Sequence, residues 1–275
     1  MNPVSDSITF IGGGNMARSL IGGLIAAGKA ADKIRVAEPV ETLRQSLAAD
    51  FSVQVFAQGQ EAVSGSAIWL LAVKPQVMKS LCQSLAEQAQ AQKPLLVSVA
   101  AGITSEQISS WLGGGLAVVR TMPNTPALLG AGVTGLYANS QVTQPQRQVA
   151  QALLQGAGAT VWIDDENLMD AVTAVSGSGP AYVFLLAEAM QAAGEAEGLS
   201  AEAARSLTIQ TLLGAAKMLT HDDTPAAELR RRVTSPGGTT QAAIESFEAD
   251  DFRAIVARAI HAARQRGIEL AKANA

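Results

Sequence analysis

The stretch "ITFIGGGNMA", residues Ile8–Ala17, contains the pattern that decides the fold. A short apolar run precedes a glycine cluster, and a segment with helical spacing follows it. The spacing Gly12-x-Gly14-x-x-Ala17 permits a tight turn, a close approach of the backbone to a pyrophosphate, and close packing of a helix on a strand. Glycine-rich turns also arise for purely conformational reasons. Because this one joins the first predicted strand to the first predicted helix, dinucleotide binding is the favoured interpretation.

A carboxylate at the end of the second predicted strand belongs to the same pattern. Glu38 lies roughly 20 residues beyond the glycine loop, where an acidic side chain accepts hydrogen bonds from a ribose 2′-OH and repels a 2′-phosphate. This favours NAD over NADP. Arg35 and Arg44 are close in sequence and favour the opposite preference, and a solvated charge at a strand end is a further alternative.

Short β-rich runs alternate with helical segments over the first part of the chain. The strand candidates are "SITFIG", "KIRVAE", "SVQVF", "AIWLLAV", "PLLVSV", "AVVRTM", "GVTGLY" and "TVWID". Such alternation predicts an α/β fold with a mostly parallel, doubly wound sheet of the Rossmann type, covered by helices on both faces. We therefore expect a dinucleotide-binding domain over residues 1–163.

The strand signal stops near Asp164. The remaining sequence is rich in Ala, Leu and Met, with breaks at "SGSGPA", "EAEGLS", "HDDTPAAE" and "TSPGGTT". Residues 164–275 are therefore expected to form an all-α domain. Its helix "AYVFLLAEAMQAAGEA" is apolar nearly all round and must be buried on most sides, so we expect a partner subunit to cover it.

Composition narrows the class of protein. The chain has 275 residues, of which 48% are hydrophobic and 16% charged, and a net charge of −4 argues against an obligate nucleic-acid partner. No apolar run approaches the roughly 20 residues of a membrane helix, and no signal peptide is visible. The single cysteine, Cys82, fits a reducing cytoplasm. We expect a cytoplasmic protein without a membrane or nucleic-acid partner.

Further candidates lie where predicted strands end, because ligands of open α/β sheets bind at the carboxyl edge. "LLAVKPQ" ends in Lys74 and Pro75; the lysine is a phosphate ligand or an ordinary surface lysine. "SVAAGI" and "RTMPNTPALLGAG" bring small residues and an asparagine to the same edge. Small residues there suit the close approach of a flat nicotinamide.

Acid–base groups are scarce in the second half. His221 and His261 are isolated, and no zinc or serine-hydrolase motif occurs, so no metal site is expected. Oxidation of an alcohol usually needs a side chain that takes the hydroxyl proton. Reduction of an imine does not need such a side chain, because a protonated C=N bond is already electrophilic. The absence of a general base therefore favours an imine substrate, whose reduction would depend mostly on proximity and orientation.

A second glycine loop, "SPGGTT" at Ser235–Thr240, precedes a predicted amphipathic helix. Glycines followed by a helix start expose backbone N–H groups to an anion. The simpler interpretation is a helix cap after a loop. A small carboxylate bound there would be a ligand separate from the dinucleotide.

Together these motifs make the chain resemble pyrroline-5-carboxylate reductase. "FIGGGNMA", "AVKPQ", "SVAAGI", "MPNTPA", "AVSGSGPAY" and "SPGGTT" occur in the order and spacing of that family, from Ile11 to the final helix. The resemblance implies a Rossmann domain, a helical domain that interlocks with a second copy in a homodimer, and decamers assembled from dimers. It also implies reduction of 1-pyrroline-5-carboxylate to L-proline, the last step of proline biosynthesis, with NADPH or NADH.

The resemblance also assigns site residues. The cofactor-binding set, with Glu38, is Gly12, Gly14, Asn15, Met16, Ala17, Ala72, Val73, Lys74, Pro75, Ala100, Ala101, Gly102 and Asn124. The substrate-binding set is Glu166, Ser235, Gly238, Thr239 and Thr240, with Thr240 as the donor to the ring nitrogen.

Two departures from the family pattern concern the cofactor. Many members carry a small hydroxyl residue or Asn where this chain has Glu38, and Gly59 stands where an Asn often touches the adenosine. Two other classes of function remain open at this point. A β-hydroxyacid dehydrogenase shares the plan but needs a catalytic lysine, and Lys217 is in no evident active-site motif. A non-catalytic dinucleotide-binding protein is the other alternative.

Overall fold

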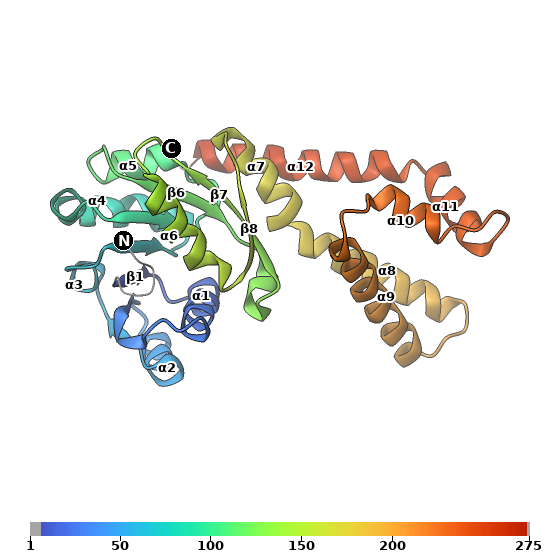
Figure 1. Ribbon diagram of the computed structural model, residues 1–275, viewed down its shortest axis with the longest axis horizontal. Coiled ribbons are helices and arrows are strands. Elements are labelled where there is room, and N and C mark those ends of the chain that lie inside the picture. Colours follow the sequence, from blue (N-terminus) through green and yellow to red (C-terminus); the bar gives the residue numbers. More distant parts are fainter. Residues whose placement is uncertain (1–6, 274–275) are drawn as a thin grey trace. The chain divides into compact units, whose positions relative to one another are not determined.

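The computed structural model describes residues 7–273 (Figure 1). The chain forms two compact units. The first contains the chain up to Ser178 together with the segment from Ala263 onward, and the second contains Gly179–Ala262. The boundary expected at residue 164 stays a prediction; the last strand ends at Trp162, and the division into units falls after Ser178.

One eight-stranded sheet organises the first unit. Its order is β3-β2-β1-β4-β5-β6-β7-β8, parallel through β6, with β7 antiparallel to β6 and β8 parallel to β7. Every predicted strand segment overlaps one of these strands, so the predicted doubly wound α/β sheet is confirmed. The strands are β1 Ile8–Ile11, β2 Ile34–Ala37, β3 Gln54–Phe56, β4 Ile68–Leu71, β5 Leu95–Ser98, β6 Val118–Met122, β7 Gly132–Ala138 and β8 Gly158–Trp162.

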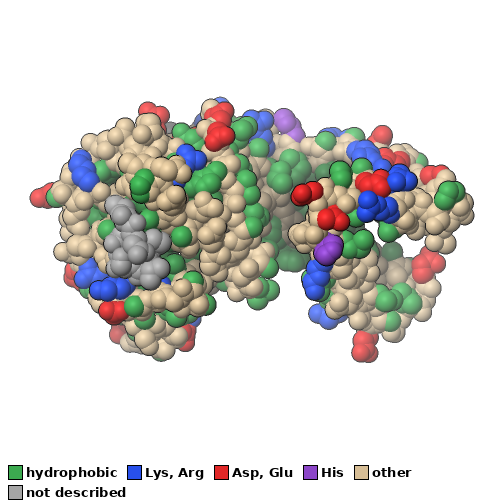
Figure 2. Space-filling view, in the orientation of Figure 1, with side chains coloured by type: hydrophobic (Ala, Val, Ile, Leu, Met, Phe, Trp, Pro, Cys, Tyr) green, Lys and Arg blue, Asp and Glu red, His purple; other side chains and the backbone are tan. Residues whose placement is uncertain are grey.

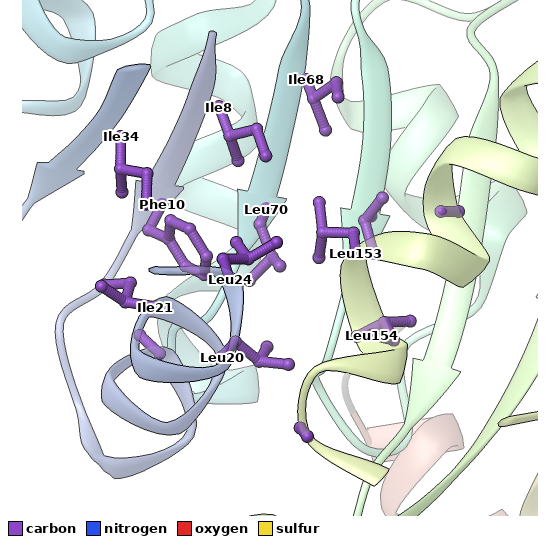
Figure 3. Packing of buried hydrophobic residues seen from close by; sticks show 14 of the residues in the cluster. Ile8, Phe10, Leu20, Ile21, Leu24, Ile34, Ile68, Leu70, Leu153 and Leu154 are labelled. Atoms are coloured by element: carbon purple, nitrogen blue, oxygen red, sulfur yellow. The ribbon is translucent and has the colours of Figure 1, made fainter. Parts of the chain in front are cut away.

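Helices cover both faces of this sheet because consecutive strand residues point to opposite sides. On β1, Phe10 packs with α1, α2 and α6, whereas Ile11 belongs to the cluster formed with α3, α4 and α5. Figure 3 shows the first cluster, with Leu153 and Leu154 of α6 beside the strand residues. The helices and short turns are α1 Asn15–Ala26, η1 Ala31–Lys33, α2 Glu41–Phe51, α3 Gly59–Ala62, α4 Pro75–Gln92, α5 Ser105–Trp111, η2 Thr125–Leu129, α6 Gln144–Gln155 and η3 Glu166–Leu168.

The chain leaves the first unit through an unusual helical segment. Helix α7 (Met169–Val172) passes directly into a π-helical turn, Thr173–Gly177, and Ser178 alone separates this turn from α8. The break predicted at "SGSGPA" falls where α8 begins at Gly179, with Pro180 in its first turn, but the chain stays helical there because the N–H of Ser178 donates to the carbonyl oxygen of Thr173 in an i→i+5 hydrogen bond. Such π turns are frequent at functional sites.

The second unit is entirely helical, as predicted. It contains α8 Gly179–Ala196, α9 Ala201–His221, α10 Ala226–Arg232, α11 Thr239–Ala249 and the first part of α12 Phe252–Ala273. Within residues 179–262, all of which the structure describes, Ala204 and Thr208 alone are buried. Hydrophobic side chains reach the surface of this unit instead (Figure 2). By itself the unit has almost no core.

Between residues 7 and 273, no helix has both the length and the apolar character needed to cross a membrane.

Candidate active site

Two positions of the first glycine loop, Gly12 and Gly13, have no room for a side chain. Gly12 has φ +100°, and a Cβ added to it would lie 2.5 Å from the carbonyl oxygen of Ala72. A Cβ on Gly13 would lie 2.5 Å from Cδ1 of Leu47. Beside Gly14, by contrast, there is open space, and as N-cap of α1 it provides no side chain to cap the helix. The first N–H groups of α1 are therefore available to an anion.

A cavity of about 640 Å³ lies beside this loop, at the carboxyl ends of the first parallel strands. Its volume is typical of small-molecule sites. It brings together six of the predicted cofactor residues: Gly12, Gly14, Glu38, Ala72, Val73 and Lys74. Gly59, which replaces the family's usual Asn, also lines it.

The remaining cofactor residues predicted from the resemblance lie outside this lining, and their roles stay predictions. Asn15 is exposed at the start of α1, Met16 packs against the core, and Ala17 is fully buried. Pro75 is the first residue of α4. Ala100, Ala101 and Gly102 form the turn between β5 and α5, where Gly102 has φ +70°.

Sequence reasoning missed part of the cavity wall. Gly13 and Pro39 lie beside residues that were predicted, and Val77, Ser80, Leu81 and Ser84 come from α4. The i, i+3, i+4, i+7 spacing of those four residues places them on one face of a helix that begins at Pro75. That spacing was a usable signal.

Glu38 is 7% exposed and already bonded within the loop. Its Oε2 accepts a hydrogen bond from the backbone N–H of Gly13 at 2.9 Å, and its Oε1 accepts one from the N–H of Val40 at 2.9 Å. The carboxylate is thus held at the cavity wall in a fixed orientation.

Neither neighbouring arginine has a recorded bond to this carboxylate. Arg35 donates to the carbonyl oxygens of Ala62 and Ser64. Arg44 donates to the carbonyl oxygens of Glu38 and Pro39, at 2.8 and 3.1 Å.

Asn124 follows β6 and uses both ends of its amide. Its Oδ1 accepts from the N–H of Val133 at 3.0 Å, and its Nδ2 donates to the carbonyl oxygen of Ser176 at 3.1 Å. Asn124 therefore ties the π turn to the start of β7. Its predicted place by the nicotinamide stays a prediction.

Glu166 lies in an ion cluster on the other side of the sheet from α1. Its oxygens accept from the N–H and the hydroxyl of Ser105, both at 2.7 Å, and Oε1 lies 3.4 Å from Nη1 of Arg120. Nη2 of Arg120 lies 3.4 Å from Oδ1 of Asp170. Burial and the nearby carboxylates of Glu166 and Asp165 raise the pKa of Tyr137. The predicted contact between Glu166 and the substrate stays a prediction.

The second glycine loop lies in the helical unit, before α11. Gly237 has φ +70°, and its N–H donates to Oε1 of Gln241 at 2.7 Å. Gly238 is the N-cap of α11 and supplies no side-chain cap, and Thr239 is the first helical residue. Ser235, Thr239 and Thr240 are exposed. The loop thus offers uncapped N–H groups and hydroxyls together, and binding of a carboxylate there stays a prediction.

Lys217 and His221 lie on α9 and line a different cavity, of about 340 Å³.

The glycine loop, the sheet order and the cavity define a Rossmann-type dinucleotide-binding protein with an added helical unit. A sequence model of "NADP oxidoreductase coenzyme F420-dependent" proteins matches residues 7–102, and one of "pyrroline-5-carboxylate reductase dimerisation" matches residues 166–270. The chain is 53% identical to the pyrroline-5-carboxylate reductase of Pseudomonas aeruginosa, over 96% of this chain and 97% of that one. It is 43% identical to the enzyme of Haemophilus influenzae, again over 96% and 97%.

Solved structures agree with these relatives. The structure of a pyrroline-5-carboxylate reductase from Coxiella burnetii matches with a TM-score of 0.93 and 39% identity, covering 97% of this chain and 98% of that one. The Plasmodium falciparum pyrroline carboxylate reductase, solved with NADP bound, matches with a TM-score of 0.85 and 27% identity, covering 98% and 99%. The chain belongs to the pyrroline-5-carboxylate reductase family.

Proposed function

We propose that this protein reduces the C=N bond of 1-pyrroline-5-carboxylate to give L-proline, with NADPH or NADH as reductant. The observation that carries the proposal is the pair of N–H cradles at two helix starts with glycine N-caps, Gly14 before α1 and Gly238 before α11, in a member of this family. One suits a diphosphate and the other a small carboxylate.

The first cradle fits a dinucleotide. A side chain on Gly12 or Gly13 would strike Ala72 or Leu47, whereas the space beside Gly14 is open. Gly12 would shape the turn, Gly14 and the first N–H groups of α1 would hold the diphosphate, and Glu38 would face the adenosine ribose. When bound, NAD(P)H supplies a hydride to the imine carbon.

The second cradle suits the substrate. We propose that the N–H groups at the start of α11 hold the substrate carboxylate, with Ser235, Gly238 and Thr239 around it. The hydroxyl of Thr240 donates a hydrogen bond to the ring nitrogen. The nitrogen of the neutral imine accepts this bond and takes the hydroxyl proton as the carbon takes the hydride, and Thr240 then regains a proton from water. Proximity and orientation supply most of the rate enhancement.

An assay tests this function directly. The purified protein is incubated with 1-pyrroline-5-carboxylate and either NADH or NADPH, and absorbance at the reduced-nicotinamide band is followed together with proline formation. We expect equimolar consumption of cofactor and formation of proline. Tight binding of cofactor and proline without turnover would instead favour a non-catalytic dinucleotide-binding protein. The dehydrogenase alternative predicts oxidation of a β-hydroxyacid, and the near-full-length reductase relatives weigh against it.

Replacing Thr240 by alanine should lower kcat about 100-fold, the lower end of the usual cost of losing one donor to the reacting group. Binding of the dinucleotide should change little, since Thr240 belongs to the second cradle. Initial rates and cofactor titration by nicotinamide fluorescence measure the two effects. Thr220→Ala, which removes an exposed threonine hydroxyl from α9, is the matched control. Unchanged kcat in Thr240→Ala would assign the proton donor to water.

The same family membership supports a proposal for the assembly and the location of the protein. The family model over residues 166–270 is a dimerisation domain, and the protein is a homo-oligomer. We propose a homodimer, with dimers assembling into decamers, in the cytoplasm. Light scattering on the purified protein gives the number of chains in each particle, and fractionation of the cells that contain it gives the location.

A further inference from the structure

A buried arginine joins the central sheet to the segment that leads out of the first unit. Arg120 lies on β6, is 4% exposed, and spans two carboxylates, Glu166 on η3 and Asp170 on α7. The planar guanidinium suits this arrangement, because its nitrogens point in fixed directions toward two acceptors at once. Neither histidine nor cysteine lies in this cluster, and Arg120 has no part in the chemistry proposed above.

Glu166 also contacts the start of α5. Both of its oxygens accept hydrogen bonds from Ser105, one from the backbone N–H and one from the hydroxyl, each at 2.7 Å. Ser105 is the first residue of α5 and is 2% exposed. Both oxygens are thereby committed to protein donors, which favours a role in holding Ser105 over a direct bond to a substrate that itself carries a carboxylate.

Ser105 ends the turn that begins where β5 stops. The turn contains Ala100, Ala101 and Gly102, the residues predicted to line the cofactor. At its other end, the N–H of Ala100 donates to Oγ of Ser98 at 3.3 Å, and Val99 N–H donates to the carbonyl oxygen of Leu71. The strand side of the turn is thus fixed by the sheet, and the helix side is held by Glu166 together with the capping box of Thr104 and Gln107.

We propose that Arg120 is a positioning residue for the nicotinamide end of the bound dinucleotide, acting through Glu166 on the turn between β5 and α5. This inference rests on the proposed function for the place of the nicotinamide beside that turn. It gives Glu166 a different role from the one that the family resemblance implies, since Glu166 holds the cofactor turn and does not bind the substrate.

Two single variants and their combination test the proposal. Arg120→Lys keeps the positive charge but loses the planar guanidinium that reaches two carboxylates at once. Glu166→Gln keeps the size of the side chain but loses its negative charge. Each should raise the dissociation constant of reduced cofactor about tenfold, which is about 1.4 kcal/mol. The KM for 1-pyrroline-5-carboxylate should stay within about twofold. Because both changes break one chain of contacts, the double variant should be no worse than the weaker-binding single variant.

The dissociation constant is measured without substrate, by nicotinamide fluorescence, so this readout does not depend on turnover. Asp165→Asn is the matched control, because the exposed Asp165 adjoins Glu166 but its carboxylate accepts hydrogen bonds from Asn167 and not from Arg120 or Ser105. It should leave cofactor binding within about twofold of the parent protein. Thermal unfolding checks that each variant is folded, and Glu166→Gln carries the test alone if Arg120→Lys does not fold.

The proposal is overturned if the variants change the KM for the imine and not the dissociation constant of the cofactor. If Glu166→Gln raises the KM for the imine and leaves cofactor binding unchanged, Glu166 contacts the substrate directly. Unchanged values for both ligands would make the cluster a matter of stability alone. Failure of the parent protein to turn over the imine would count against the proposed function, whereas the comparison of cofactor dissociation constants would still decide the role of Arg120.

Discussion

Replacing Glu38 by serine should move the ratio of kcat/KM for NADPH to that for NADH about 100-fold toward NADPH, which is about 2.7 kcal/mol of differential binding. The carboxylate lines the dinucleotide cavity and is held by the N–H groups of Gly13 and Val40. A 2′-phosphate beside it would bring a second negative charge close to one that cannot turn away. Two like charges at about 4 Å repel by about 4 kcal/mol at an effective dielectric constant of 20.

Neither neighbouring arginine pairs with this carboxylate. Arg35 and Arg44 donate to backbone carbonyls, which keeps their recorded hydrogen bonds away from the carboxylate. Serine removes the charge and leaves room and a hydroxyl for the phosphate. Part of the affinity for NADH should also fall, because the ribose loses an acceptor and Gly13 loses its partner.

Steady-state kinetics with both cofactors, and dissociation constants for NAD⁺ and NADP⁺, measure this shift. Glu41→Ser is the matched control, since Glu41 has the same charge three positions further on and is absent from the cavity lining. A change in Glu38→Ser no larger than in Glu41→Ser would remove Glu38 from the cofactor site.

Much of the fold could be predicted because its determinants are local in sequence. Strands buried on both faces appear as continuous apolar runs, and "IWLL" of β4 is fully buried as such a run predicts. The glycine loop could be predicted as well, because the φ of +100° at Gly12 and the spacing Gly12-x-Gly14-x-x-Ala17 both belong to one short segment.

The ion cluster could not be predicted in the same way. Arg120 meets Glu166 and Asp170 across 46 and 50 positions, and sequence spacing carries no information on such a contact. A buried arginine in a strand looks like any β-strand residue until its partners are known. The π turn at Thr173–Gly177 was hidden for another reason, since glycine and serine favour loops unless packing holds them helical.

Replacing Leu185 by glutamate should convert the oligomer to monomers, with at least a 100-fold increase in the dissociation constant, about 2.7 kcal/mol. Leu185 is 65% exposed and its neighbour Phe184 is 66% exposed, on a helix without a single buried residue. Burial of one such side chain is worth about 1.5–3 kcal/mol. In a symmetric dimer the change occurs twice, and each glutamate would also have to leave water.

The matched control changes an exposed leucine outside the helical unit. Leu43 on α2 is 43% exposed, and Leu43→Glu adds the same charge to the sheet-containing unit. Light scattering and sedimentation at micromolar concentration should report intact oligomers for Leu43→Glu and monomers for Leu185→Glu. Because residues 179–262 bury only Ala204 and Thr208, the monomer should also lose the concentration dependence of its unfolding temperature and unfold its helical unit first. An oligomer that survives Leu185→Glu with unchanged stability would mean that something other than a second copy covers α8.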